Sequence, residues 1–314
     1  MRPFAYARAQ SAEAAVAAAG AAGVEDDDGA GLAPSAELAA GAADAPATLA
    51  ATQFIAGGTT LLDLMKLDVM RPRCLIDLNT LEADYQQIRA DSQGLWLGAL
   101  VRMSAAAEHA HIVKDYPVLA QSLQLGASPQ LRNMATLGGN VLQRTRCNYF
   151  RDPSYAECNK RTPGSGCAAI HGRNRKLAVL GVSEHCIAHY PGDLAQALVA
   201  LEASVELYGR SGRRTLPLED LHRLPASTPH LETVLGRGEL IVGFHVPART
   251  WTRRSLFLKI RDRSSYEFAL ASAAVALDLS DGAVRQVRIA LGGVATKPWR
   301  AREAERAAGG TEAR

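Results

Sequence analysis

Apolar and polar residues alternate along the first half of the chain in a way that predicts short strands interleaved with helices. The predicted strands cover residues 53–56, 73–78 and 95–101. Leu61, Leu62, Leu64, Met65 and Leu67 recur with helical spacing directly after the first strand. Ser104 is a typical N-cap and predicts one long helix that ends at about residue 125. Strands mixed with helices in this manner indicate an α+β fold.

The second half of the chain shows the same mixture on both sides of a segment rich in proline and glycine. Before it, we expect a helix over 193–202, a strand over 204–208 and a short helix over 218–222. After it, we expect strands over 240–246, 255–259 and 284–290, a helix near 268–276 and a last helix from about Arg300. Pro225, Pro229, Gly236 and Gly238 mark a boundary. The predicted domains are therefore residues 1–220 and 225–314.

The N-terminal region is poor in large apolar side chains. Residues 12–22 are rich in alanine but are interrupted by Glu13, which favours a surface helix over a secretory signal. Residues 21–48 are low in complexity and contain an acidic run, so a flexible surface insertion or linker is expected there. No run of about 18 uncharged apolar residues predicts a membrane span. By its own sequence we expect the chain to be cytoplasmic, with co-export on a partner that carries a signal as the alternative.

Composition and charge exclude several classes of protein. Hydrophobic residues make up 47% of the sequence and charged residues 21%, which is a globular mixture and not that of a disordered chain. Lys and Arg number 35 against 32 Asp and Glu, so the net charge is +3. A balance this even gives no general attraction to nucleic acid or to acidic membranes. We therefore expect neither as a partner.

Two loops, each with a Gly-Gly pair and hydroxyl residues, are candidates for holding an anionic ligand. The first is Ala56-Gly57-Gly58-Thr59-Thr60, between a predicted strand and a helix, and the second is Thr136-Leu137-Gly138-Gly139-Asn140. Glycine lets a backbone approach a phosphate closely because no Cβ intervenes. One such loop alone is usually only a turn, and neither matches G-x-G-x-x-G or the P-loop. Together they favour a dinucleotide site.

Four of the five cysteines lie close together in the sequence, at Cys147, Cys158, Cys167 and Cys186, while Cys74 stands apart. Four thiolates can hold a [4Fe–4S] cluster or a structural zinc ion, and the absence of C-x2–4-C pairs favours the cluster over zinc. Two disulfides and four unligated thiols remain the other interpretations.

The segment around these cysteines is also rich in basic residues and histidines. Its basic residues could offset an anionic cluster, dock an acidic partner or form a solvated loop: Arg144, Arg146, Arg151, Lys160, Arg161, Arg173, Arg175 and Lys176. Histidines 171, 185 and 189 are interpreted as surface residues or as neighbours of the ligands. No G-x-S-x-G or H-E-x-x-H motif is present. The residues by themselves therefore indicate a cofactor-binding chain without an evident substrate-activating acid or base.

Several of these motifs together resemble a known family. Phe54–Leu62 and Arg132–Asn140, in this order and at this spacing, resemble the FAD-binding (medium) subunit of the xanthine dehydrogenase and aldehyde oxidase family of molybdenum hydroxylases. Ile289–Ala295 and Pro298–Glu305 resemble the C-terminal domain of that subunit. The resemblance is narrower in the cysteine segment, at 142–147, 158–167 and 179–188. These stretches look like the FAD subunit of bacterial periplasmic aldehyde oxidoreductases, which carries an extra [4Fe–4S] cluster.

The resemblance implies a role for individual residues. Those expected to wrap the FAD pyrophosphate are Phe54, Ile55, Ala56, Gly57, Gly58, Thr59, Thr60 and Leu61. Those expected to complete the phosphate and ribityl contacts are Thr136, Leu137, Gly138, Gly139 and Asn140. Asp193 matches an acid that hydrogen-bonds FAD, or caps a helix. Lys259 matches a lysine that tunes the flavin, and Ile241 packs on the isoalloxazine or is a core strand residue. Cys147, Cys158, Cys167 and Cys186 are the implied [4Fe–4S] ligands.

The resemblance also implies an architecture and a function. The fold would be a two-subdomain FAD-binding domain of the PCMH type with an iron–sulfur insertion at 144–190. A C-terminal α+β domain of the CO dehydrogenase flavoprotein type would follow, with FAD between the two. The chain would be an oxidoreductase subunit in a heterotrimer, with a molybdopterin-binding large subunit that oxidises an aldehyde and a small [2Fe–2S] subunit. Its FAD would pass electrons to an external, ferredoxin-like acceptor. The alternatives are a stand-alone flavin oxidoreductase and a zinc-binding interaction protein without enzymatic activity.

Overall fold

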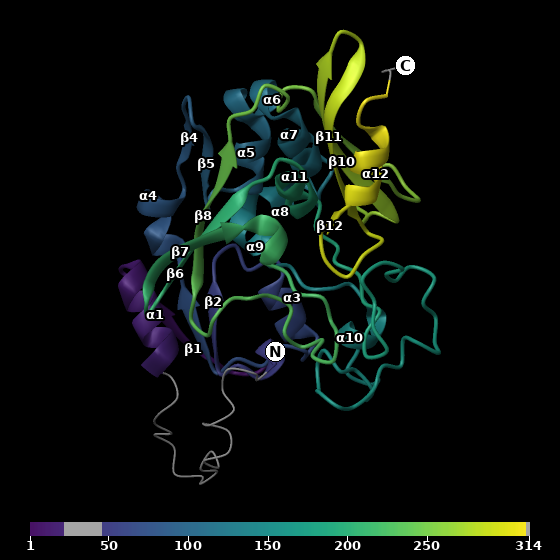
Figure 1. The fold of residues 1–314 in the computed structure, drawn as a ribbon. Helices are drawn as coiled ribbons and strands as arrows, with labels where there is room; N and C mark the ends of the chain where they lie inside the picture. The colour runs from purple at the N-terminus through teal and green to yellow at the C-terminus, as the bar shows by residue number, and fades with distance from the viewer. Residues whose placement is uncertain (22–45, 312–314) are drawn as a thin grey trace, which may run out of the picture.

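The computed structural model describes residues 1–21 and 46–311, which contain three β-sheets with helices packed on them (Figure 1). Most of the low-complexity segment predicted at 21–48 lies outside the described residues. The first sheet is parallel, and its strand order is β1 (Ala5–Arg8), β3 (Cys74–Asp77), β2 (Thr52–Ile55). Helix α1 (Ala12–Ala21) packs on this sheet through Ala15 and Val16, which share a core with Ile76. The predicted alanine-rich helix is thus confirmed, and one of its faces is buried.

The second sheet is antiparallel and has the order β4 (Ile88–Ala90), β5 (Gly94–Gly98), β8 (Leu240–Pro247), β6 (Ser204–Gly209), β7 (Gly212–Pro217). Strand β8, which the sequence analysis assigned to the C-terminal domain, pairs with β5 and β6 in the middle of this sheet. The change of sheet therefore falls between β8 and the next strand, after the boundary predicted at 220–225. The prolines and glycines of 225–238 lie in a long loop within the first unit.

Helices on the second sheet enclose the largest core of the described residues. They are α5 (Met103–Glu108), α6 (Ala110–Asp115), α7 (Pro117–Gln124), α8 (Pro129–Met134), α9 (Leu137–Val141) and α11 (Leu194–Ala200). The single helix predicted over 104–125 is wrong, because it is three helices. His109 is extended, with φ −68° and ψ 126°, and Tyr116 leaves the helical region before Pro117. A residue before proline is disfavoured in the helical conformation, which explains the second break.

Short helical turns complete the first unit. They are η1 (Ala47–Leu49), α3 (Leu61–Lys66), η2 (Asn79–Leu81), α4 (Glu82–Tyr85), α10 (Asn148–Arg151) and η3 (Leu218–Asp220). The helices predicted at 61–67, 193–202 and 218–222 are confirmed within a few residues. The cysteine segment 144–190 contains α10 and is otherwise irregular; in Figure 1 it forms the teal loops beside α10.

The third sheet forms the C-terminal unit, with the order β12 (Trp299–Arg300), β11 (Ala283–Gly292), β10 (Ala271–Ser280), β9 (Ser255–Ile260), and α12 (Arg302–Ala308) follows it. The helix predicted near 268–276 is wrong, because most of this stretch is β10. Ser272, Ala274 and Ala276 are buried on one face, and the residues between them are partly exposed. This period of two suits a strand paired on both sides, which overrides the helix preference of alanine.

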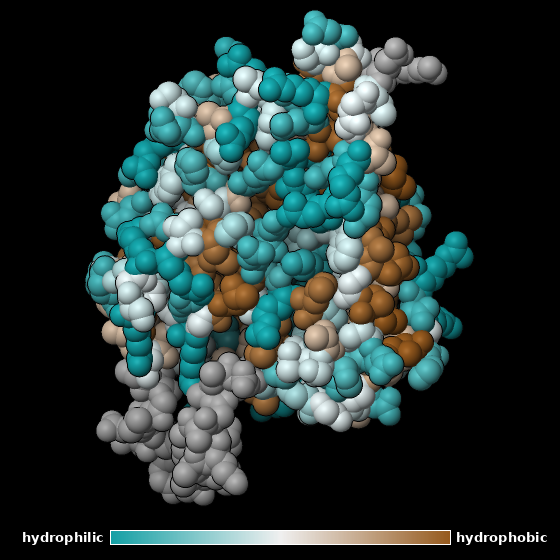
Figure 2. All heavy atoms as spheres, in the orientation of Figure 1, coloured by the Kyte–Doolittle hydropathy of each residue, from teal (hydrophilic) through white to brown (hydrophobic). Residues whose placement is uncertain are grey.

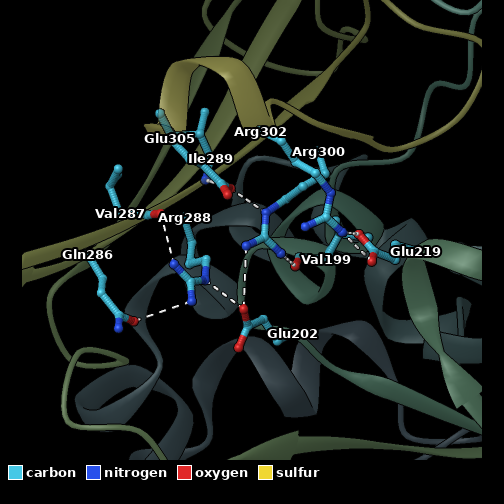
Figure 3. Close-up of polar contacts among 10 residues, drawn as sticks. All are labelled: Val199, Glu202, Glu219, Gln286, Val287, Arg288, Ile289, Arg300, Arg302 and Glu305. Carbon is cyan, nitrogen blue, oxygen red and sulfur yellow. Dashed lines mark hydrogen bonds and ion pairs between the residues drawn. The ribbon is translucent and has the colours of Figure 1, made fainter. Parts of the chain in front are cut away.

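A network of ion pairs joins the C-terminal unit to α11 (Figure 3). Glu202, just after α11, accepts hydrogen bonds from Arg288 of β11 at 2.6 Å and from Arg300 of β12 at 3.4 Å. Arg300 also donates to the carbonyl of Val199 at 3.3 Å, and Arg302 donates to Glu219 at 2.5 and 2.8 Å. The two units are thus fixed to each other by charge as well as by their shared core.

The surface is mainly hydrophilic, with hydrophobic residues gathered along the side that carries the C-terminal sheet and the cysteine segment (Figure 2). Leu256, Leu258 and Ile260 of edge strand β9 are each more than half exposed. Exposed apolar patches often mark interfaces with other proteins. Within the described residues, every helix is too short or too polar to cross a lipid bilayer.

Candidate functional site

A cavity of about 960 Å³ lies next to the small parallel sheet and is the main candidate for a ligand site. Most of its lining residues come from the segments 47–64, 70–73, 136–145, 186–190 and 222–241. Thr296 is the residue of the C-terminal unit that reaches the wall, among those that the structure describes. The cavity therefore lies within the first unit, next to the C-terminal one, and not midway between two equal domains. Its volume is at the upper end of the usual range for ligand pockets.

The first glycine loop forms one wall, and all of Phe54 to Leu61 line the cavity. The loop follows β2 and leads into α3, as the sequence predicts. Gly58 has a φ of 71°, which favours glycine, and a Cβ on Gly57 would lie 1.9 Å from the carbonyl oxygen of Met134. Thr60 stands at the N-cap of α3, yet its side chain makes no capping hydrogen bond. Both glycines are thus required by the local geometry.

The second glycine loop faces the first, and Thr136, Gly138 and Gly139 line the cavity. The Thr136 hydroxyl accepts a hydrogen bond from the backbone N–H of Gly139 at 3.2 Å and so caps α9. Leu137 is fully buried and packs into the core instead. Asn140 is not among the lining residues; its Nδ2 contacts Met103 Sδ at 3.3 Å, and its buried Oδ1 has no partner.

Asp193 and Lys259 contact each other and do not line the cavity. Lys259 Nζ donates to Asp193 Oδ2 at 2.6 Å and to the Leu125 carbonyl at 3.1 Å, and both side chains are more than nine-tenths buried. Burial raises the pKa of Asp193, and the Lys259 ammonium opposes this shift. Asp193 stands at the N-cap of α11 without a capping hydrogen bond, and its Oδ1 is buried without a partner.

Ile241 lines the cavity and also packs against the main core from β8, so its position is compatible with either interpretation of its role. Its neighbours in the wall were missed by the sequence analysis, because they come from a loop that was interpreted as a linker. Among them, His222 and His230 are buried and Glu232 is partly buried. The His222 ring contacts the Tyr190 ring edge to face at 4.7 Å. No local pattern in 222–241 distinguishes a cavity wall from a connection between domains.

His222 shows how this wall is built. Its Nε2 donates to the Val141 carbonyl at 3.1 Å, the same carbonyl to which Tyr190 Oη donates at 2.8 Å. Burial lowers the pKa of His222 to about 4, so the ring is neutral at pH 7. His189 also lines the cavity, is buried, and has its pKa lowered to about 4 by burial. His171 and His185 are exposed, as expected, whereas His189 is not a surface residue.

The four clustered cysteines share one hydrophobic core with Leu64, Met65 and Phe150. All four are free thiols, so the structure does not contain the two disulfides of the alternative interpretation. The backbones of Cys158 and Cys167 pair in an isolated bridge, and Cys186 lines the cavity. Within the described residues, however, no three His, Cys, Asp or Glu side chains form a group placed to hold a metal ion. Burial raises the pKa of Cys147 to about 11.

Charged residues form the part of the cavity wall that includes Cys186. Glu232 pairs with Arg144 at 2.5 Å and with Lys160 at 3.0 Å, and all three line the cavity. Burial also raises the pKa of Cys186, and the nearby Lys160 ammonium opposes the rise. Asp63 of α3 accepts hydrogen bonds from Arg146 and Arg151 on either side of Cys147. The cysteine segment is therefore attached to the helix that follows the first glycine loop.

The chain has a two-unit α+β fold, and its two glycine loops border one large cavity. Such a site can hold an extended ligand that contains phosphate. Residues 34–249 match the family model of the FAD binding domain in molybdopterin dehydrogenase, and 257–314 match that of the CO dehydrogenase flavoprotein C-terminal domain. The chain belongs to this family, the FAD-binding medium subunits of the xanthine dehydrogenase and CO dehydrogenase type. It is thus an FAD-binding oxidoreductase subunit.

Particular relatives narrow the comparison. The chain is 50% identical over 254 residues to the aldehyde oxidoreductase FAD-binding subunit PaoB of Escherichia coli, covering 81% of this chain and 78% of that one. It is 25% identical to the glyceraldehyde dehydrogenase medium chain of Sulfolobus acidocaldarius, covering 81% and 72%. The structure of a carbon monoxide dehydrogenase from Hydrogenophaga pseudoflava matches with a TM-score of 0.69 and 25% identity, covering 100% of this chain and 82% of that one.

Proposed function

We propose that this chain is the FAD-binding subunit of a molybdenum-dependent aldehyde oxidoreductase. In this role it passes electrons from the [2Fe–2S] clusters of a partner subunit to an external acceptor. The observation that carries the proposal is the cavity where the two glycine loops meet. The chain that contains this cavity is 50% identical to an aldehyde oxidoreductase FAD-binding subunit. FAD, when bound, supplies two-electron redox chemistry to this site.

The residues of the two loops fit a pyrophosphate. Gly57 and Gly58 bring the backbone to the cavity wall without a Cβ, and Gly138 and Gly139 of the second loop do the same. Thr59 and Thr60 also line the cavity, and each carries a hydroxyl that can donate to a phosphate. The glycine backbone would hold the phosphates, and the Ile241 side chain would pack against an aromatic ring in the same cavity.

Asp193 and Lys259 fit a supporting role for the flavin. Asp193 has one oxygen without a partner in a buried position, and Lys259 places a cation beside it. Because neither lines the cavity, we expect their influence on the flavin to be electrostatic and not a direct contact. The Lys259 ammonium would favour negative charge on the ring, and the Asp193 carboxylate would weaken this effect.

We also propose that Cys147, Cys158, Cys167 and Cys186 hold a [4Fe–4S] cluster. Four free thiols that share one core are the donor set that such a cluster requires, and Cys186 also touches the FAD cavity. The thiols must approach one another and lose their protons to bind iron, against a Cys147 pKa of about 11. The cluster, when bound, supplies one-electron chemistry next to the cavity.

The proposed partners are a molybdopterin-binding large subunit, a [2Fe–2S] small subunit and an acidic, ferredoxin-like acceptor. The acceptor would dock on the exposed Arg173, Arg175 and Lys176 beside the thiols. Lys176 already pairs with Asp262 at 3.0 Å, so Arg173 and Arg175 should contribute most. Replacing both by Ala should slow acceptor reduction at low salt and leave aldehyde-dependent flavin reduction unchanged. An unchanged rate of acceptor reduction would exclude docking at this place.

The function is tested by mixing the purified complex with an aldehyde without oxygen and following flavin absorbance. The proposal predicts bleaching of the flavin only when the partner subunits are present. Bleaching of the isolated chain by a substrate of its own would instead identify a stand-alone flavin oxidoreductase. A colourless chain with one zinc ion would identify a zinc-binding interaction protein.

A further inference from the structure

The two glycine loops belong to different parts of the first unit, so something must set the distance between them. The first loop follows β2 of the parallel sheet, and the second begins α9, which packs in the main core. They meet where Gly57 lies against the carbonyl of Met134, two residues before Thr136. A shift of either part would open or close the space in which a pyrophosphate must fit.

Asn79 and Arg102 connect the two loops by a continuous chain of hydrogen bonds. Asn79 Nδ2 donates to the carbonyl of Ala56 in the first loop at 3.1 Å. Arg102 Nη2 donates to Asn79 Oδ1 at 3.0 Å, and Arg102 Nη1 donates to the carbonyl of Met134 at 2.6 Å. Three hydrogen bonds thus run from the backbone of one loop to the backbone next to the other.

Both members of this pair are held in place by further contacts. Asp77 at the end of β3 accepts from the Asn79 backbone N–H at 2.9 Å and from its amide at 2.6 Å. Arg102 also pairs with Glu82, and its backbone forms a bridge with Thr136 at the start of the second loop. Only 17% of the Arg102 side chain is exposed. Asn79, Asp77, Glu82 and Arg102 do not line the cavity, so they act on it through the loops.

We propose that Asn79 and Arg102 form a latch that sets the spacing of the two glycine loops. The latch thereby selects a dinucleotide, whose pyrophosphate contacts both loops, over a flavin without phosphates. This inference rests on the proposed function of the cavity as an FAD site. Arginine suits the position because its planar fork reaches two acceptors at once, whereas lysine offers a single point of attachment.

The latch is tested in the full-length chain freed of flavin, by measuring the dissociation constants of FAD and of riboflavin from flavin fluorescence. Arg102→Met removes the link, and Asn79→Asp keeps an acceptor for Arg102 but loses the donor to Ala56. Each should weaken FAD binding by about tenfold or more, as expected for hydrogen bonds to a charged group. Riboflavin binding should change by less than about twofold, since that ligand has no pyrophosphate to span the loops, and Arg102→Lys should fall between wild type and Arg102→Met.

Arg89→Met is the matched control, because Arg89 stacks on Trp96 at 4.2 Å in the same unit without contacting either loop. It should leave both dissociation constants unchanged. The latch is wrong if folded Arg102→Met and Asn79→Asp bind FAD like the wild type, or if both flavins weaken by the same factor. If the wild-type chain binds neither flavin, the proposed FAD site itself is wrong, which separates the two failures.

Discussion

Single residues decide the shape of the ligand site, and Gly57 does so most directly. A side chain there would meet the backbone carbonyl of Met134 at 1.9 Å, and backbone atoms cannot move aside as a flexible side chain can. The sequence indicates this glycine as a candidate, but the carbonyl that it faces is 77 residues further along the chain (134 − 57). Only the fold brings the two together.

We expect Gly57→Ala to push the two glycine loops apart and to lower FAD affinity by at least about tenfold, since a contact under 3 Å forces a backbone shift. FAD content per purified chain measures the effect. Gly309→Ala is the control, because a Cβ there meets its first neighbour at 3.6 Å and lies far from the cavity. Normal FAD content in Gly57→Ala would contradict the close approach of the loops.

Because His222 is buried, we expect the free energy of unfolding to depend on pH. Its folded pKa is about 4, below the ordinary 6.5, because the ring is buried, with Lys297 adding to the shift and Val141 and Glu232 opposing it. Between pH 6.5 and about 4, His222 binds a proton in the unfolded chain but not in the folded chain. His222 therefore reduces stability as the pH falls from 6.5 to about 4, by up to roughly 3 kcal/mol.

The measurement is the free energy of unfolding of wild type and His222→Phe between pH 7 and pH 4.5. Phenylalanine keeps the ring against Tyr190 and loses the hydrogen bond to Val141. The advantage of the wild type should shrink as the pH falls. Parallel curves for the two proteins would show that the ring is not held neutral in the folded state.

Elements were predictable where local pattern and tertiary contacts agree. Strand β2, α3 and α11 follow from their runs of apolar residues, because each packs against neighbouring elements; α3 buries Leu64 and Met65, and every residue of α11 is buried. Strand β10 was mistaken for a helix, since its alanines favour helix and only pairing with β9 and β11 decides otherwise. The strand predicted at 240–246 was placed in the C-terminal domain, whereas β8 pairs with β5 and β6 of the first unit, because pairing between distant segments leaves no local signal.

The same reasoning applies to the site. The glycine loops were predictable because their chemistry is local, whereas the wall formed by His222, His230 and Glu232 was not. These residues reach the cavity wall through contacts with residues of other elements, such as Val141 and Arg144, and such contacts leave no local pattern in the sequence. The roles of Asp193, Lys259 and the cysteines stay predictions until they are measured.

If the four clustered cysteines hold a [4Fe–4S] cluster, the iron content of the chain should depend on each of them. Cys147→Ser, Cys158→Ser, Cys167→Ser or Cys186→Ser should each lower the iron and acid-labile sulfide of the purified chain, because four thiolates share the cluster. Cys74→Ser is the control, since Cys74 lies on β3 and packs in a different core. Equal iron in all five variants would show that these thiols hold no cluster.

At the scale of the whole molecule, Glu202 connects the C-terminal unit to the first unit through ion pairs. Its carboxylate accepts from Arg288 and Arg300, and these two cations hold the pKa of Glu202 below its usual value against the effect of burial. Its side chain is 32% exposed, so the contribution is less than that of a fully buried pair. Through this carboxylate, strands β11 and β12 are fixed to the end of α11, in the unit that contains the cavity.

Glu202→Gln should destabilise the chain by about 1–2 kcal/mol, because it removes the charge that both arginines face. Thermal unfolding should show an earlier transition for the C-terminal unit. Glu303→Gln is the control, since Glu303 pairs with Arg306 at 3.6 Å and is 82% exposed. An unchanged transition in Glu202→Gln would mean that the shared core alone holds the units together.

The most direct test of the central claim is the cofactor content of the chain, purified without oxygen together with its partner subunits. The measurements are the visible spectrum and assays of flavin, iron and acid-labile sulfide. The account predicts one FAD per chain, released by denaturation as the dinucleotide, with about four irons and four sulfides in addition to those of the [2Fe–2S] partner. A folded complex that contains no flavin would contradict it.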